Sequence, residues 1–322
     1  MAGRTDRPAV VAIGGGHGLA TTLRAVRRYA GEITAVVTVA DDGGSTGRLR
    51  RDLGILGVGD LRKCLAALAA SDHDAAAWAE TFAYRFDSGD LTGHALGNLI
   101  LVGLAETTGD WIEALDLAGR TLAAVGRVLP ATAGPVVLRA EGDSGTIQGQ
   151  VAIQNSGDRI RRIALDPPDA PSPPEVVAAL SAADQIVLAP GSLFTSLLPA
   201  LVAPDVRAAV VASSAPVVMV MNLEPQLPET AGLDAVDHLR AVRDLGIRVD
   251  HVVVDDRCRL AGDRARLEAL EVSVSVEPVA RPDVRAHEPA KLASALAAVL
   301  SSGVGRGPEH PGNGQRRPEE GS

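Results

Sequence analysis

The stretch Ala9-Val-Val-Ala-Ile13, followed by Gly14-Gly15-Gly16-His17-Gly18 and an apolar run from Leu19, decides the fold class of this 322-residue chain. A short apolar run that ends in glycines is typical of a buried parallel strand, and Leu19–Tyr29 has helical spacing. Glycines between a strand and a helix let backbone N–H groups approach a phosphate at the positive end of the helix dipole. The stretch therefore predicts the opening strand, turn and helix of an α/β fold. A tight turn without a ligand would explain the glycines equally well.

Strand and helix patterns continue to alternate along the chain. Ile33–Val39 is rich in β-branched residues and predicts a second buried strand. Further strands are predicted at 185–189, 216–222, 250–255 and 272–278, and helices at 191–202, 234–245 and 288–300. Because strands separated by helices pair in parallel, this order predicts a doubly wound parallel sheet.

Two segments interrupt this alternation. Residues 60–125 have helical spacing near 60–70, 72–86, 94–106 and 110–124, and the expected N-caps are Asp60, Ser71 and Asp110. Residues 135–166 contain short strand patterns, including Thr146–Ile153 after the turn Gly142-Asp-Ser-Gly145, and predict an antiparallel β-meander. We expect one α/β domain over 8–300 that contains both insertions, followed by a disordered tail over 301–322.

The composition is that of a globular protein and disfavours several functions. A net charge of −9 and 2% aromatic residues offer a nucleic acid neither a basic surface nor stacking rings. Cys64 and Cys258 lie far apart, which argues against a disulfide framework or a structural zinc site. Without a signal-peptide pattern or about 20 consecutive apolar residues, we expect a soluble cytoplasmic protein with no membrane contact. The motifs of P-loop NTPases, serine hydrolases and zincins do not occur.

Four of the predicted strands end in small or polar residues. Ligands of open parallel sheets bind outside the carboxyl ends of the strands, so we expect these loops to line one cleft. The candidate ligand-binding residues at the strand ends are Gly15, Gly16, His17, Gly18, Asp41, Asp42, Gly44, Ser45, Gly191, Ser192, Thr195 and Asn222. His94 and Asn98, four residues apart beside Gly93 and Gly97, share one face of a predicted helix and are further candidates.

Asp41 and Asp42 are compatible with more chemical roles than the other candidate residues. They can accept hydrogen bonds from ribose, bind Mg²⁺, or act as a general base, and the residues Gly43–Gly47 behind them resemble an anion-binding nest. An acidic turn is the structural alternative for this pair. Likewise, Ser192 can be an N-cap, and His17 a solvated loop residue. Asn222 is hardest to explain as core, because a buried amide needs partners.

Together these motifs resemble the gluconeogenesis factor family (YvcK-like), a branch related to 2-phospho-L-lactate transferase (CofD-like). The matching segments span roughly 9–300: Gly14-Gly-Gly-His-Gly-Leu19, Val37-Thr-Val-Ala-Asp-Asp-Gly-Gly-Ser-Thr-Gly-Arg-Leu-Arg50, Gly59-Asp-Leu-Arg62, Gly93-His-Ala-Leu-Gly-Asn-Leu99, Pro190-Gly-Ser-Leu-Phe-Thr-Ser196 and Asn222…Gln226…Glu229-Thr230. The resemblance implies a three-layer Rossmann-like fold, binding of a nucleotide sugar such as UDP-N-acetylglucosamine, and a role in gluconeogenic carbon use and cell shape.

The same resemblance assigns roles to individual residues. It implies that Asp41 and Asp42 face the phosphates or ribose, and that Gly191, Ser192 and Asn222 line the nucleotide pocket. It adds Gln226, Glu229 and Thr230 as ligand-binding candidates. The chain departs from the family at His17, where Thr is usual, and at 224–228, where two prolines stiffen the loop.

Three functions are compatible with these residues. In the first, the cleft binds a nucleotide sugar and reports its level to a protein partner, because no nucleophile–base pair is evident. In the second, a CofD-like transferase moves a phospho-lactyl-type group from a nucleotide diphosphate donor to an acceptor hydroxyl, with Asp42 as base or Mg²⁺ ligand. The third, a dinucleotide-dependent oxidoreductase, depends on the glycine turn and Asp41 alone. The sequence leaves open whether the protein forms a homo-oligomer.

Overall fold

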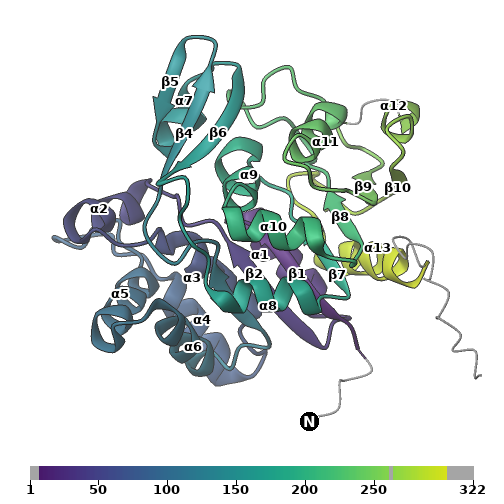
Figure 1. Ribbon diagram of the computed structural model, residues 1–322. Coiled ribbons are helices and arrows are strands. Elements are labelled where there is room, and N and C mark those ends of the chain that lie inside the picture. Colours follow the sequence, from purple (N-terminus) through teal and green to yellow (C-terminus); the bar gives the residue numbers. More distant parts are fainter. Residues whose placement is uncertain (1–6, 261–263, 303–322) are drawn as a thin grey trace, which may run out of the picture.

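The computed structural model describes residues 7–260 and 264–302, and its centre is a seven-stranded sheet (Figure 1). All neighbouring strands are parallel, in the order β10-β9-β8-β7-β1-β2-β3. The strands are β1 (Ala9–Gly14), β2 (Glu32–Val37), β3 (Arg127–Pro130), β7 (Gln185–Leu188), β8 (Val217–Val220), β9 (His251–Asp255) and β10 (Ser273–Glu277). The predicted doubly wound parallel sheet is confirmed. The short edge strand β3 was not predicted.

The winding of the sheet reverses between β1 and β7. After β1 the chain adds β2 and β3 on one side, and the later strands β7 to β10 follow on the other side. In an open parallel sheet, the loops that leave two such central strands diverge and create a crevice at the carboxyl edge. The crevice between β1 and β7 is therefore where the topology favours a ligand.

Helices cover both faces of the sheet and give the three-layer architecture that the sequence predicted (Figure 1). On one face α1 (Gly16–Val26) packs against α3 (Val58–Leu68) and α13 (Pro289–Ser301). On the other face α8 (Pro174–Ala182) packs against α10 (Pro204–Ala212). Two further helices, α11 (Ala235–Arg243) and α12 (Arg264–Glu268), belong to the C-terminal half. The helix predicted at 191–202 is divided into a π-helix η1 (Leu193–Leu197) and α9 (Leu198–Leu201).

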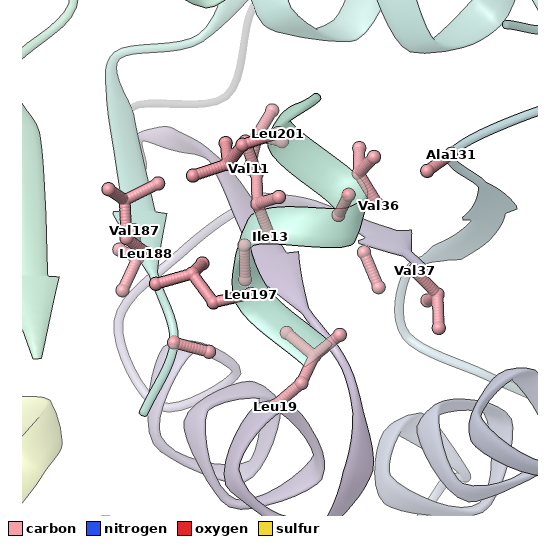
Figure 2. Close-up of a cluster of buried hydrophobic side chains, with 14 of the residues drawn as sticks. Val11, Ile13, Leu19, Val36, Val37, Ala131, Val187, Leu188, Leu197 and Leu201 are labelled. Carbon is pink, nitrogen blue, oxygen red and sulfur yellow. The ribbon is translucent and has the colours of Figure 1, made fainter. Parts of the chain in front are cut away.

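Branched apolar side chains fill the space between the sheet and the helices (Figure 2). The labelled members of the cluster are Val11 and Ile13 on β1, Val36 and Val37 on β2, Val187 and Leu188 on β7, Leu19 on α1, Ala131 after β3, and Leu197 and Leu201 on the helices after β7. Because both faces of the sheet are covered, its central strands β1, β7 and β8 are nearly continuous apolar runs, which is why the sequence located them.

The region between β2 and β3 is helical, as predicted. Its helices are α2 (Gly44–Leu53), α3, α4 (His73–Ala83), α5 (Leu96–Thr108) and α6 (Trp111–Thr121). Asp110 caps α6 by accepting from the N–H groups of Ile112 and Glu113. Two predicted caps are wrong: Asp72, not Ser71, caps α4, and α3 begins at Val58, before Asp60. Asp60 is available for another contact, described below.

The inserted antiparallel sheet is confirmed, but its strand order is β5-β4-β6 rather than that of a simple meander. Its strands are β4 (Val137–Gly142), β5 (Gly145–Gln148) and β6 (Ile160–Asp166). The strand predicted over Thr146–Ile153 ends at Gln148, and helix α7 (Gln150–Asn155) follows it. Gly149 has a φ of +98°, which takes the chain out of the extended conformation, and α7 returns it to the other side of β4.

No single helix in the described ranges is long and apolar enough to cross a membrane. Among the described helices, one pair, Leu193–Leu201 and Pro204–Ala212, has that length and apolarity together, and it is bent by 72°. At the C-terminus, α13 ends at Ser301. The disordered tail that the sequence predicts lies, from residue 303 onwards, outside the described residues.

Candidate functional site

The loops that contain most predicted site residues leave the same edge of the sheet. Because β1, β2, β7 and β8 are parallel, their carboxyl ends lie on one side, followed by Gly14–Gly18, Asp41–Gly47, Pro190–Ser192 and Asn222–Gln226. The loops therefore share one edge of the sheet, whereas the expectation that all of them line one cleft is met only for part of the residues. Within this edge, the residues form separate clusters.

A cavity of about 310 Å³ opens at the crevice between β1 and β7. It is lined by parts of four segments, namely 17–21, 190–191, 222–226 and 284–287. Five predicted residues line it: His17, Gly18, Gly191, Asn222 and Gln226. The fourth segment contains Arg285 and His287, which the sequence did not single out. Neither belongs to a recognisable motif, so only the packing of the C-terminal loop brings them here.

The glycine turn approaches the chain after β7 very closely. A Cβ atom on Gly18 would lie 1.7 Å from the carbonyl oxygen of Pro190, so only glycine fits. The first N–H groups of a helix have no intrahelical partner, which leaves those of Gly16, His17 and Gly18 as donors at the start of α1. Gly16 donates to the carboxylate of Asp60 at 2.6 Å, and Lys63 lies 2.9 Å from the same carboxylate. The backbone donors nearest to the cavity are thus those of His17 and Gly18.

Asn222 holds the loops after β7 and β8 together. Its Oδ1 accepts from the N–H of Gly191 at 2.6 Å, and its Nδ2 donates to the carbonyl of Gly191 at 2.7 Å. The buried amide that was hard to explain from the sequence thus has both of its partners on one residue, the N–H and the C=O of Gly191.

The loop after Asn222 and the segment 284–287 each contain a buried acceptor. Thr230 accepts from the N–H of Gln226 at 2.8 Å and fixes the turn between them. The Oε1 atom of Gln226 and the Nε2 atom of His287 are buried, and neither has a hydrogen-bond partner among the described residues. Burial lowers the pKa of His287 to about 4, so its imidazole is neutral at pH 7. Both residues line the 310 Å³ cavity.

Ser192, Thr195 and Glu229 form a second cluster beside the first. The Ser192 hydroxyl lies 2.5 and 2.6 Å from the two carboxylate oxygens of Glu229, which also accepts from Thr195 Oγ1 at 3.2 Å. The N–H of Phe194 donates to Glu229 at 2.7 Å. Burial raises the pKa of Glu229. The carboxylate therefore occupies the N-terminus of η1, and these three residues do not line the 310 Å³ cavity.

A third cluster contains Ser45, His94 and Asn98. The Ser45 hydroxyl is 3.0 Å from Nδ1 of His94 and accepts from Nδ2 of Asn98 at 3.1 Å. Arg62 donates to Oδ1 of Asn98 at 3.0 Å. The prediction that His94 and Asn98 share a helix face is wrong, because α5 begins at Leu96, with Ala95 as its N-cap. They meet through Ser45 instead.

The two adjacent aspartates have different environments. Asp42 accepts from the N–H groups of Gln150 and Val151, each at 2.9 Å, and so caps α7 from 108 and 109 residues away. Asp41 accepts from the N–H of Gly43 at 3.0 Å. Burial, followed by the nearby carboxylate of Asp60, raises the pKa of Asp41.

The stretch expected to form an anion-binding nest is the start of α2, which begins at Gly44. In the described residues, no group of three or more His, Cys, Asp or Glu side chains is placed to hold a metal ion. A Mg²⁺ ion at Asp41 or Asp42 stays a prediction that needs ligand phosphate oxygens to complete its coordination.

The sequence of this chain is similar to those of known proteins. The family model described as 2-phospho-L-lactate transferase CofD matches residues 10–290. A relative from Mycobacterium tuberculosis (strain ATCC 25618 / H37Rv) is 43% identical over 315 residues, which cover 92% of this chain and 91% of the relative. The gluconeogenesis factor of Bacillus subtilis (strain 168) is 42% identical over 239 residues, which cover 74% of each chain.

A solved structure shares the fold. The crystal structure of a UPF0052 family member from Bacillus halodurans superposes with a TM-score of 0.85 at 35% identity, covering 91% of this chain and all of the other. This chain belongs to the CofD family, among the relatives named gluconeogenesis factors.

Proposed function

We propose that this protein is a cytoplasmic gluconeogenesis factor that binds a nucleotide sugar of the UDP-N-acetylglucosamine type at the crevice between β1 and β7. In this proposal, occupancy of the site regulates carbon use, supply of cell-wall precursors and cell shape through a protein partner. The observation that supports it most directly is the 310 Å³ cavity that four segments form at this crevice. Cavities of about 300–1,000 Å³ are typical of small-molecule sites.

The cavity lining offers a separate partner for each part of such a ligand. The N–H groups of His17 and Gly18 begin α1, where the helix dipole favours a phosphate. Arg285 adds a guanidinium group, which can form paired hydrogen bonds with phosphate oxygens. The unpartnered acceptors on Gln226 and His287 are buried beside the cavity, and rotation of either side chain into the cavity would present its acceptor to the N–H and hydroxyl donors of a base or sugar. Since 310 Å³ is at the lower end of the range, the sugar extends along the edge towards the loop after β2.

A binding role is favoured over catalysis by the position of Asp42. Both oxygens of this carboxylate accept N–H groups of α7, and Asp42 does not line the cavity. A general base must lie within hydrogen-bond reach of the proton that it removes. The second candidate function, a CofD-like transferase, is supported by the description of the matching family. In that function, Asp41 or Asp42 would hold Mg²⁺ together with donor phosphates.

Thermal unfolding with a nucleotide panel tests the proposal. UDP-N-acetylglucosamine at a hundred times its dissociation constant should stabilise the fold by about 2.7 kcal/mol. The substitution Gln226→Ala should weaken binding about tenfold, because it removes one buried acceptor. The matched control is Gln154→Ala, an exposed glutamine on α7. If no UDP-sugar shifts the melting temperature, the proposal fails. Product formed from a nucleotide diphosphate donor, an acceptor alcohol and Mg²⁺ would favour the transferase.

A further inference from the structure

Strand β6 is an edge strand whose outer side faces a cavity. In the inserted sheet β6 pairs with β4 on one side, through residues from Val137 to Gly142. On its other side no strand pairs with it in the described parts of the chain. In an antiparallel strand every second residue directs its N–H and C=O away from a given neighbour. The outer side of β6 therefore presents unpaired backbone donors and acceptors.

The residues that line the adjacent cavity show how β6 is oriented. The cavity has a volume of about 770 Å³ and is lined by every residue from Arg159 to Leu165. Successive side chains of a strand point to opposite faces, so one face of β6 could supply only alternate residues. A lining of consecutive residues means that the cavity runs along the edge of the strand. Its opposite wall comes from α9, α10 and α11.

The floor of this cavity is apolar. Ile160, Ile163 and Leu165 of β6 are between 4% and 8% exposed, and Phe194 and Leu198 complete the floor at 7% and 4%. Alternate apolar side chains of an added strand would pack here.

The rim of the same cavity is positively charged, although the protein carries a net charge of −9. Five arginines and two aspartates contribute to the lining. Arg161 is paired with Asp143 at 2.6 Å, and Arg240 lies 3.9 Å from Asp237. The other three, Arg159, Arg162 and Arg207, are exposed and form no ion pair with any described residue. These unpaired guanidinium groups complement a negatively charged partner.

From these observations we infer that β6 is a docking site for an extended acidic segment of a partner protein, which adds to the inserted sheet as a fourth strand. Backbone hydrogen bonds along the outer side of β6 provide the affinity. Acidic side chains on the arginine rim and apolar side chains on the floor provide the specificity. The seven residues of β6 set the length of the segment. This site is separate from the 310 Å³ cavity, which shares no lining residue with it.

A fluorescein-labelled peptide of seven alternating Glu and Val residues tests this inference on the full chain by fluorescence anisotropy. We expect saturable binding, slower amide hydrogen exchange within 160–166, and no binding of the matching Lys–Val peptide. Two further peptides carry N-methyl groups, one on its Val residues and the other on its Glu residues. One of them should fail to bind, because it has lost the N–H groups that face β6.

Charge reversal on the protein completes the test. Arg162→Glu and Arg207→Glu should each weaken binding about fivefold or more, whereas Arg51→Glu, an exposed arginine on α2, should leave it unchanged. The inference is overturned by the absence of binding, by equal binding of both N-methylated peptides, or by insensitivity to both charge reversals. Equal binding of the methylated peptides would mean that charge alone attracts the peptide.

Discussion

The side-chain amide of Asn222 forms two hydrogen bonds with the backbone of Gly191: Oδ1 accepts from its N–H at 2.6 Å, and Nδ2 donates to its C=O at 2.7 Å. The pair joins the loops after β8 and β7 on the cavity side of the sheet. Gly191 has a φ of +148°, a conformation that side chains rarely adopt, so the pair also holds an unusual backbone in place. The shape of the candidate ligand site thus depends on a contact between two residues that are 31 positions apart in the sequence.

Removing this contact should destabilise the protein. We expect Asn222→Ala to lower the free energy of unfolding by about 1–3 kcal/mol, because the polar groups of Gly191 lose their partners. Asn222→Asp should cost at least as much, since a carboxylate beside the carbonyl of Gly191 accepts but cannot donate. Urea denaturation gives the values, with the exposed Asn155→Ala as control. Equal midpoints for Asn222→Ala and the unmodified protein would contradict the structural role.

Replacing Asp42 should destabilise helix α7, whether or not a ligand is bound. Asp42→Ala removes an acceptor from the N–H groups of Gln150 and Val151, and loss of such a cap costs about 0.5–2 kcal/mol. We expect faster hydrogen exchange over 150–155 in this variant, measured by mass spectrometry. Asp42→Asn keeps one acceptor oxygen and should give an intermediate rate. Unchanged exchange in both variants, combined with weaker nucleotide binding, would instead assign the carboxylate to the ligand.

Ser45 should be more important for stability than its size suggests. Ser45→Ala leaves the Nδ2 donor of Asn98 and the ring nitrogen of His94 buried without a partner, at a cost of about 1–3 kcal/mol. Calorimetric melting in parallel with Ser71→Ala provides a matched comparison. Ser71 is exposed and caps no helix, so its replacement should change stability by less than about 0.5 kcal/mol. Similar losses of stability in the two variants would contradict a stabilising role for the cluster of Ser45, His94 and Asn98.

Stability should fall as the pH is lowered from about 6.5 to about 4. The pKa of His287 is about 4 in the folded protein because of burial, against 6.5 for an unperturbed histidine. Between these values the unfolded chain binds the proton and the folded protein does not, so protonation favours unfolding. A pKa difference of this size between the folded and the unfolded protein corresponds to about 3 kcal/mol of unfolding free energy. His238 and His251, whose pKa values burial also lowers, act in the same direction.

The variant His287→Gln isolates the contribution of this histidine. Its unfolding free energy should depend less steeply on pH over the same interval, as measured by urea titrations at several pH values. An unchanged slope would show that the ring is accessible to protons in the folded state. Asp41 and Glu229, whose pKa values are raised by burial, oppose the trend, which is why the difference between variants is the quantity to measure.

The sequence by itself determined the parallel sheet and the edge at which its polar loops gather. Buried strands such as Val10–Ile13 are continuous apolar runs, and the glycines and aspartates that follow them mark the carboxyl ends of strands. These signals are local, because hydrophobic burial and turn geometry act on neighbouring residues. The motifs were also sufficient to identify the family.

Only the tertiary structure decided which polar groups meet. Asp42 caps a helix more than a hundred residues away, Asp60 accepts from the first N–H of α1, and His287 reaches the cavity from the C-terminal loop. The partner of a buried polar group is fixed by where distant segments pack, and local patterns carry no information about that packing. The same reason explains the strand order of the inserted sheet, since the unpaired side of β6 follows from how α7 returns the chain across β4.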